Sequence, residues 1–477
     1  MLVLLVVATV AGLAVVRLTP LPVTPKAGDR PNIILITSDD QRADDMVAMQ
    51  RTEELIGDEG TTFDRAYASF PLCCPSRASM LTGQYAHNHG VLGNGGNGIG
   101  GFKDFDGSST LATWLQDAGY STNFVGKYLN RFGTVRPVEV PPGWDDFRGS
   151  LAGGNYFETV LFQNGESQTY DDVNQTDLYA GISSDLITER AADDEPFFLW
   201  ASFYAPHNGR PSEDDDPVDG IGTPAVAPRH QDVFEGTPLP EDPSFDEQDV
   251  SDKPEAVSSQ PALPAALQDD LTELHQQRLE SLLALDEGIE HMMSALGASG
   301  ELDNTVIVFT SDNGYMLGEH RIHAGKTVMY EPSARVPLLV RGPGFPVGVT
   351  QQQPVALVDL APTFVDMARA TAGLTMDGVS LLPPAQDSEA GTDRVIVIEA
   401  GPEEVGQEWN YRGVRNARYV YVEYGESGET ELYDMAEDPY QLENLTFSPS
   451  AADRQVVADM ADLLDALRDC AGTACQP

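Results

Sequence analysis

An uninterrupted apolar run at residues 32–38, Asn-Ile-Ile-Leu-Ile-Thr-Ser, constrains the fold of this chain most. It is rich in β-branched residues and lacks polar–apolar alternation, which predicts a strand buried on both faces of a parallel sheet. Further strands are predicted at 121–125, 197–203 and 305–310. Helical patterns separate these runs at 110–117, at 267–296 with an expected break, and at 358–370. This alternation predicts an α/β fold with a mainly parallel mixed sheet flanked by helices.

Polar side chains follow each of the four predicted strands. They are Asp39 and Asp40, then Lys127, then His207, and finally Asp312 with Asn313. In open α/β sheets, ligands bind outside the carboxyl ends of the strands. The shared position of these residues therefore predicts a single site.

The pattern of predicted secondary structure changes after about residue 384. Shorter strand patterns follow at 394–399, 411–423 and 431–434, and an amphipathic helix is expected at 452–467. We therefore predict a large domain at 31–383 and a small C-terminal α+β domain with an antiparallel sheet at 384–477. Within the large domain, residues 212–264 are rich in proline and acidic residues. This composition predicts a long loop on the surface, called the excursion below, and its functional interpretation is a lid beside the site.

Residues 1–30 are predicted to be a signal peptide or an N-terminal anchor. The apolar run at 2–16 is too short for a membrane-spanning helix and suits the core of a signal peptide. No basic residue precedes this core and Arg17 follows it, so cleavage and retention both stay open. We expect an exported protein, secreted or membrane-anchored through this segment. In an oxidising compartment, Cys470 and Cys475 could form a small disulfide, with two free thiols as the alternative.

The net charge of the chain limits the classes of molecule that it is expected to bind. With 75 acidic against 28 basic residues, the formal net charge is −47. Such a surface repels nucleic acid and anionic lipid, so we expect no nucleic-acid partner. An anionic substrate would need local positive charge at the active site. Adaptation to a saline habitat is an alternative reason for the acidity.

The segment 70–83 carries the most specific chemistry. A short helix is expected to begin near Ser76 and to end at Gly83, which places Cys73 just before its N-terminus. The helix dipole and the guanidinium of Arg77 would both favour an anion beside Cys73. This arrangement predicts a nucleophile in an anion pocket. A pair of buried structural cysteines, Cys73 and Cys74, is the alternative.

The run Cys73-Cys74-Pro75-Ser76-Arg77, followed by Leu81-Thr82-Gly83, resembles the Cys-x-Pro-Ser-Arg…Thr-Gly motif of type I sulfatases. The resemblance implies a large domain like that of alkaline phosphatase and a sulfate ester as substrate. In this family the first cysteine, here Cys73, is oxidised to formylglycine by a formylglycine-generating enzyme that acts on the unfolded chain. The hydrate of that aldehyde attacks the sulfur of the ester.

Four of the strand-end residues offer only oxygen ligands, which suit Ca²⁺ or Mg²⁺ and not zinc: Asp39, Asp40, Asp312 and Asn313. Acidic residues after strands are also common in so acidic a chain. Sulfatases hold a divalent metal with an Asp-Asp pair after the first strand and an Asp-Asn pair late in the domain. The resemblance therefore implies that these four residues and the modified Cys73 hold a cation, with Ca²⁺ preferred.

Arg77, Lys127 and Lys326 are the predicted positive lining of the site, although a surface lysine beside a turn glycine would show the same local pattern. The resemblance implies that both lysines touch the sulfate and the leaving oxygen. It also implies that His207 faces the leaving group and donates its proton.

One position departs from the family pattern. Many sulfatases carry a histidine two residues after the first lysine, where this chain has Leu129. The run 126–130 instead resembles the N-acetylglucosamine-6-sulfatase branch, which implies sulfated glycans such as glucosamine 6-sulfate as substrates. The base that expels sulfate stays open, with His89 and His320 as candidates. Phosphodiester or phosphonate monoester hydrolysis, and non-catalytic binding of sulfated glycans, are the alternative functions.

Overall fold

A computed structural model describes residues 30–476, apart from 97, 152, 214–215, 218–219, 241 and 403–406. All but the last residue of the predicted signal peptide or anchor lies outside the described residues. Among the helices that are described, none combines the length and the apolar character needed to cross a membrane.

The four predicted strands form the centre of the main sheet. They are β9 (Thr305–Ser311), β1 (Asn32–Ser38), β8 (Phe197–Ser202) and β4 (Ser121–Gly126), side by side and parallel. Within the described residues this sheet has ten strands in the order β12-β2-β11-β9-β1-β8-β4-β5-β6-β7. The outer strands are β2 (Thr61–Phe63), β11 (Leu338–Arg341), β12 (Val349–Gln351), β5 (Asp146–Ser150), β6 (Glu158–Gln163) and β7 (Glu166–Asp171). Antiparallel pairs occur only toward the edges of the described sheet, which confirms a mainly parallel mixed sheet.

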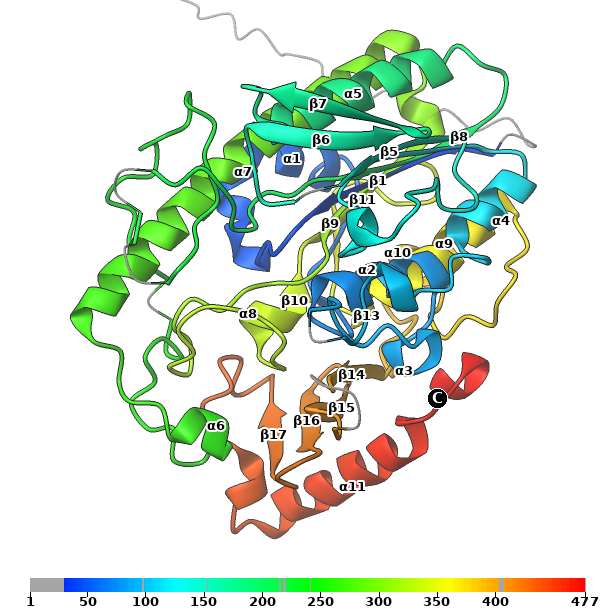
Figure 1. Cartoon of the computed structure of the whole chain (residues 1–477). Helices are drawn as coiled ribbons and strands as arrows, with labels where there is room; N and C mark the ends of the chain where they lie inside the picture. The colour runs from blue at the N-terminus through cyan, green and yellow to red at the C-terminus, as the bar shows by residue number, and fades with distance from the viewer. Residues whose placement is uncertain are drawn as a thin grey trace, which may run out of the picture.

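Helices cover both faces of this sheet (Figure 1). Helices α5 (Gln175–Arg190) and α7 (Ala265–Ser299) pack on the face where Ile34 and Ile36 of β1 point. Helices α2 (Cys73–Thr82), α4 (Leu111–Asp117) and α9 (Leu360–Ala368) pack on the face of Ile33 and Leu35. Alternate residues of β1 thus enter two separate cores, which explains why its sequence is apolar throughout.

Helix α7 corrects one prediction. It runs without a break over 35 residues, whereas the sequence predicted an interruption. Gly288 lies within it and faces α5, where an added Cβ would come within 2.7 Å of the Ala180 Cβ. This glycine therefore permits close packing of two helices.

The C-terminal part forms a separate antiparallel sheet, as predicted. Its strands are β14 (Ile396–Ala400), β15 (Tyr411–Arg415), β16 (Tyr419–Tyr424) and β17 (Thr430–Asp434). Helix α11 (Ala451–Leu467) covers one face through Met460 and Leu464 (Figure 1). Cys470 and Cys475 beyond it form a disulfide. The boundary at residue 384 stays a prediction.

Short elements connect these layers. A small sheet contains β10 (Arg335–Val336), β3 (Ala66–Tyr67) and β13 (Val355–Ala356). The short helices are α1 (Gln50–Thr52), α3 (Ala86–His89), α6 (Glu255–Ser258), α8 (Glu331–Ala334) and α10 (Leu382–Gln386). The described part of the 212–264 excursion contacts both domains: the Phe234 amide donates to Glu280 on α7, and Lys253 Nζ donates to the Leu442 carbonyl.

Candidate active site

Helix α2 begins at Cys73, three residues earlier than the predicted start near Ser76. Leu72 is extended and its carbonyl accepts the first helical hydrogen bond, from the Ser76 amide. Pro75 is tolerated because the first turn of a helix needs no amide donor at that position. Gly83 ends the helix in the left-handed region with φ 67°, as predicted. Cys73 is therefore the first helical residue, and it is fully buried.

Carboxylates from neighbouring strands meet beside Cys73. Because β1 and β9 are parallel and in register at Ser38 and Ser311, the residues that follow them lie side by side. The Asp40 amide donates to Asp312 Oδ1 at 3.1 Å, and Asn313 Nδ2 donates to Asp40 Oδ1 at 2.8 Å. Cys73 Sγ lies 3.5 Å from Asp39 Oδ1. The structure thus brings together all five residues of the predicted metal set.

The donor atoms of this set fit a hard cation. Ligand atoms of Asp39, Asp40, Cys73 and His207 all lie within 4.8 Å of one another. Asn313 Oδ1 is buried and has no hydrogen-bond partner among the described residues, so it is free to coordinate. Asp312 is turned partly away, since its Oδ2 accepts from Arg77 Nε at 2.8 Å. The set is dominated by oxygen, which is the ligand type that Ca²⁺ and Mg²⁺ prefer.

Three cationic side chains enter the same cluster, as predicted. Arg77 is fully buried, and its guanidinium also reaches Asp39 Oδ2 at 3.3 Å. Lys127 Nζ contacts Asp39, and Lys326 Nζ contacts Asp40 and lies 2.9 Å from Cys73 Sγ. A site in a chain of net charge −47 therefore has local positive charge.

Burial and charge pairing set the protonation of these groups. Burial alone would raise the pKa of Asp39, but Lys127, His207 and Arg77 outweigh it and hold that pKa well below its usual range. The pKa of Lys127 is raised, because the attraction of Asp39 exceeds the effect of burial. Burial raises the pKa of Cys73 to about 12 and Asp39 adds to the effect, so the unmodified side chain is a thiol at neutral pH.

His207 lies at the mouth of the cluster. Its side chain is 21% exposed and that of Lys326 is 13% exposed, whereas the carboxylates beneath them are almost completely buried. His207 Nδ1 lies 2.9 Å from the Asn208 carbonyl, which leaves Nε2 facing Asp40 Oδ2 at 3.8 Å. Burial lowers the pKa of His207. A substrate would thus meet His207 and Lys326 before the buried residues.

Two functional neighbours were missed by the sequence analysis. Ser202 Oγ accepts from Arg77 Nη1 at 2.5 Å, and the Tyr204 ring lies beneath both Lys127 and His207. Their position at the end of β8, just before His207, was the available signal.

The two candidates for the elimination base lie elsewhere. His89 Nε2 is 3.1 Å from Ser79 Oγ, and burial lowers its pKa to about 3. His320 Nδ1 is 2.6 Å from Glu247, and its ring packs on Tyr330. In the described structure we find no contact of either with Cys73, so neither is placed to act on a group at that position.

Comparison with known proteins agrees with this geometry. A family model described as Sulfatase matches residues 31–370, which is most of the chain. This chain belongs to the sulfatase family. A second model, described as N-sulphoglucosamine sulphohydrolase, C-terminal, matches residues 318–470. The resemblance inferred from the Cys73 motif is confirmed, and with it the activity of a sulfuric ester hydrolase.

Individual relatives extend over nearly the whole chain. The N-acetylglucosamine-6-sulfatase of Capra hircus is 30% identical over 94% of this chain and 86% of its own length. The Extracellular sulfatase SULF-1 homolog of Drosophila melanogaster is 34% identical over 74% of this chain, which spans only 31% of that relative. A structure solved in complex with its substrate D-glucosamine-2-N,6-O-disulfate has a TM-score of 0.75 and 25% identity, and covers 92% of this chain and 97% of its own.

Proposed function

We propose that this sulfatase hydrolyses 6-O-sulfate esters of glucosamine residues in sulfated glycans. The observation that carries the proposed ester hydrolysis is the position of Cys73 Sγ, 3.5 Å from Asp39 Oδ1 and 2.9 Å from Lys326 Nζ. The motif cysteine therefore lies between a carboxylate cluster and a cation that can bind an ester oxygen.

The nucleophile is proposed to be formylglycine made from Cys73. Because Cys73 is fully buried in the folded chain, a modifying enzyme would have to reach it before folding. This burial supports a formylglycine-generating enzyme as a partner of the unfolded chain. The hydrated aldehyde would supply the hydroxyl that attacks sulfur.

The metal is proposed to be Ca²⁺, with Mg²⁺ as the alternative. Asp39, Asp40, Asp312, Asn313 and the modified Cys73 would hold it, and the free Oδ1 of Asn313 supports this assignment. A bound cation would polarise a sulfate oxygen as a Lewis acid.

The remaining residues would orient the ester and protonate its leaving oxygen. Lys127 and Arg77 are held by buried carboxylates and would stabilise negative charge on the sulfate oxygens. Lys326 and His207, at the mouth, are the proposed donors to the departing alcohol. Donation from His207 would come from Nε2 of the protonated ring, since its Nδ1 faces the Asn208 carbonyl.

The choice of glucosamine as the substrate sugar rests on the similarity of this chain to two relatives. The goat relative is named for N-acetylglucosamine 6-sulfate, and the solved relative holds a disulfated glucosamine. Rates on sulfated monosaccharides, aryl sulfates and phosphonate monoesters test this choice. We expect the highest kcat/KM on glucosamine 6-sulfates. A strong preference for choline sulfate, a steroid sulfate or a phosphonate would contradict the proposal, and no turnover of any ester would favour a non-catalytic binder.

Peptide mass spectrometry tests the nucleophile. We expect formylglycine at Cys73 and an unmodified Cys74 in the active protein. Full activity with an intact Cys73 thiol would overturn this part of the proposal.

Secretion is proposed from the apolar segment at 2–16 and from the extracellular relative. Cell fractionation with N-terminal sequencing should find the protein outside the cytoplasm, either cleaved within residues 1–30 or anchored. A full-length cytoplasmic protein would contradict it.

A further inference from the structure

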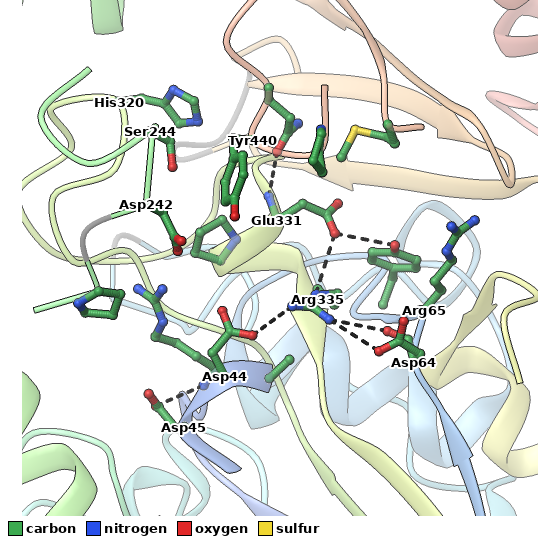
Figure 2. A pocket seen from close by; sticks show the side chains of 18 of the residues that line it. Asp44, Asp45, Asp64, Arg65, Asp242, Ser244, His320, Glu331, Arg335 and Tyr440 are labelled. Atoms are coloured by element: carbon green, nitrogen blue, oxygen red, sulfur yellow. Dashed lines mark hydrogen bonds and ion pairs between the residues drawn. The ribbon is translucent and has the colours of Figure 1, made fainter. Parts of the chain in front are cut away.

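A cavity of about 760 Å³ is lined by none of the residues assigned to the active site (Figure 2). Its walls come from several distant parts of the chain. They are Arg42 with the short helix η1 (Ala43–Ala48), residues 64, 65 and 67, residues 237–240, 242 and 244 of the excursion, His275 and Leu279 of α7, His320, α8 with β10, and the loops around 416 and 440 of the C-terminal sheet. Cavities of this size between domains are typical of ligand sites.

Two buried side chains in its wall have polar atoms without partners. Arg42 is 1% exposed, and its Nη1 donates to Glu319 at 2.6 Å, but Nε and Nη2 have no hydrogen-bond partner in the described part of the chain. His275 is 7% exposed, and its Nδ1 is likewise unpartnered among those residues. These atoms lie within the wall of the cavity and not on its surface, so the exposed lining residues decide which ligand the cavity fits.

The charges around the cavity are already balanced. Arg335 pairs with Asp44 at 2.8 Å and lies near Asp64 and Glu331, as Figure 2 shows. Arg415 pairs with Glu331 at 2.5 Å. An anion that approached Arg42 would also meet the carboxylates of Asp44, Asp45 and Asp242, which line the same cavity. A neutral polar ligand avoids this repulsion.

Tyr440 gives the cavity a flat apolar surface. Its side chain is 40% exposed, and Figure 2 shows it between Asp242 and Glu331. A sugar ring offers an apolar face for such an aromatic ring and hydroxyl donors for the carboxylates of Asp44 and Asp242.

We propose that this cavity binds a neutral saccharide segment, as a glycan site separate from the active site. It would retain unsulfated stretches of the substrate chain, and this part of the inference rests on the proposed function. The affinity of the cavity for a neutral saccharide does not rest on the proposed function, because it needs no sulfate ester and no formylglycine.

Isothermal titration calorimetry with chitotetraose, a neutral N-acetylglucosamine oligomer, tests the proposal on the full chain. The variant is Tyr440→Ala, and the matched control is Phe447→Ala, an aromatic residue that is 68% exposed and does not line the cavity. We expect Tyr440→Ala to weaken binding roughly three- to tenfold, because it removes the aromatic face on which the sugar ring would pack. Phe447→Ala should bind like the wild type, and both variants should hydrolyse a small aryl sulfate at the wild-type rate.

Four outcomes would overturn the inference. The first is no chitotetraose binding at millimolar concentration, and the second is equal affinity in Tyr440→Ala and the wild type. The third is competition by inorganic sulfate, which would place the sugar in the active site. The fourth is binding of a sulfated oligomer alone, abolished by salt, which would indicate an anion site. Chitotetraose binding without turnover of glucosamine 6-sulfate would support the cavity site and refute only the proposed function.

Discussion

Replacement of Glu431 tests how the C-terminal sheet supports the active site. Glu431 lies on β17, is fully buried, and accepts hydrogen bonds from three tyrosine hydroxyls: Tyr330 at 3.0 Å, Tyr424 at 2.6 Å, and Tyr433. Tyr330 follows Lys326 by four residues, in the segment that leads from β9 to α8. This carboxylate therefore ties the segment carrying Lys326 to the C-terminal sheet.

We expect Glu431→Gln to lower the free energy of unfolding by about 2 kcal/mol. Hydrogen bonds to a charged group contribute about 1.5–3 kcal/mol each and neutral ones about 1, so three weakened bonds would cost about 1.5–6 kcal/mol. Burial of the carboxylate, which raises its pKa, offsets part of this cost. The variant should also turn over a small aryl sulfate several-fold more slowly with little change in KM, because Lys326 is less well held.

Equilibrium urea unfolding and steady-state kinetics measure both effects. Glu423→Gln is the control: it lies on the adjacent strand β16 and accepts from the Tyr421 hydroxyl at 3.0 Å, but its side chain is 33% exposed. We expect the control to change stability by less than about 0.5 kcal/mol. Equal unfolding free energies for Glu431→Gln and the wild type, or equal losses in the two variants, would refute the reasoning.

Three further predictions concern the active site. Cys73→Ala should abolish turnover, as measured by steady-state kinetics. Cys74→Ala removes one sulfur from the apolar core, so it should keep most activity and lower the free energy of unfolding by about 1 kcal/mol, as measured by kinetics and equilibrium unfolding. Asp312→Asn keeps an acceptor for the Asp40 amide but loses a charged metal ligand. Elemental analysis of this variant should find less Ca²⁺ or Mg²⁺, and assays should find no turnover. If zinc, bound stoichiometrically, were the only metal to restore activity to the metal-free wild type, the predicted ligand set would be contradicted. Arg77→Lys cannot reach Asp312 and Asp39 together and should lower the unfolding free energy by about 3 kcal/mol and abolish turnover; wild-type stability would argue that the two ion pairs are dispensable.

The sequence by itself determined the central strands and the chemistry at their ends. Residues 32–38 were predicted as a strand and form β1 with the same bounds. A strand buried on both faces must be apolar along its whole length, so its sequence carries the signal locally. Parallel strands end at one edge of the sheet, so the residues after them had to meet. This is why Asp39, Asp40, Asp312 and Asn313 could be grouped from the sequence.

Only the tertiary structure decided which of these side chains touch. Arg77 pairs with Asp312, 235 positions away, and no local pattern specifies that contact. His89 and His320 looked suitable from their positions in the sequence, yet each is held by a partner outside the active site. No local pattern indicated that Gly288 permits close packing of α7 against α5. The cavity beside Tyr440 likewise exists only because several distant segments fold together, since hydrogen bonds and cavities depend on distances that local sequence does not encode.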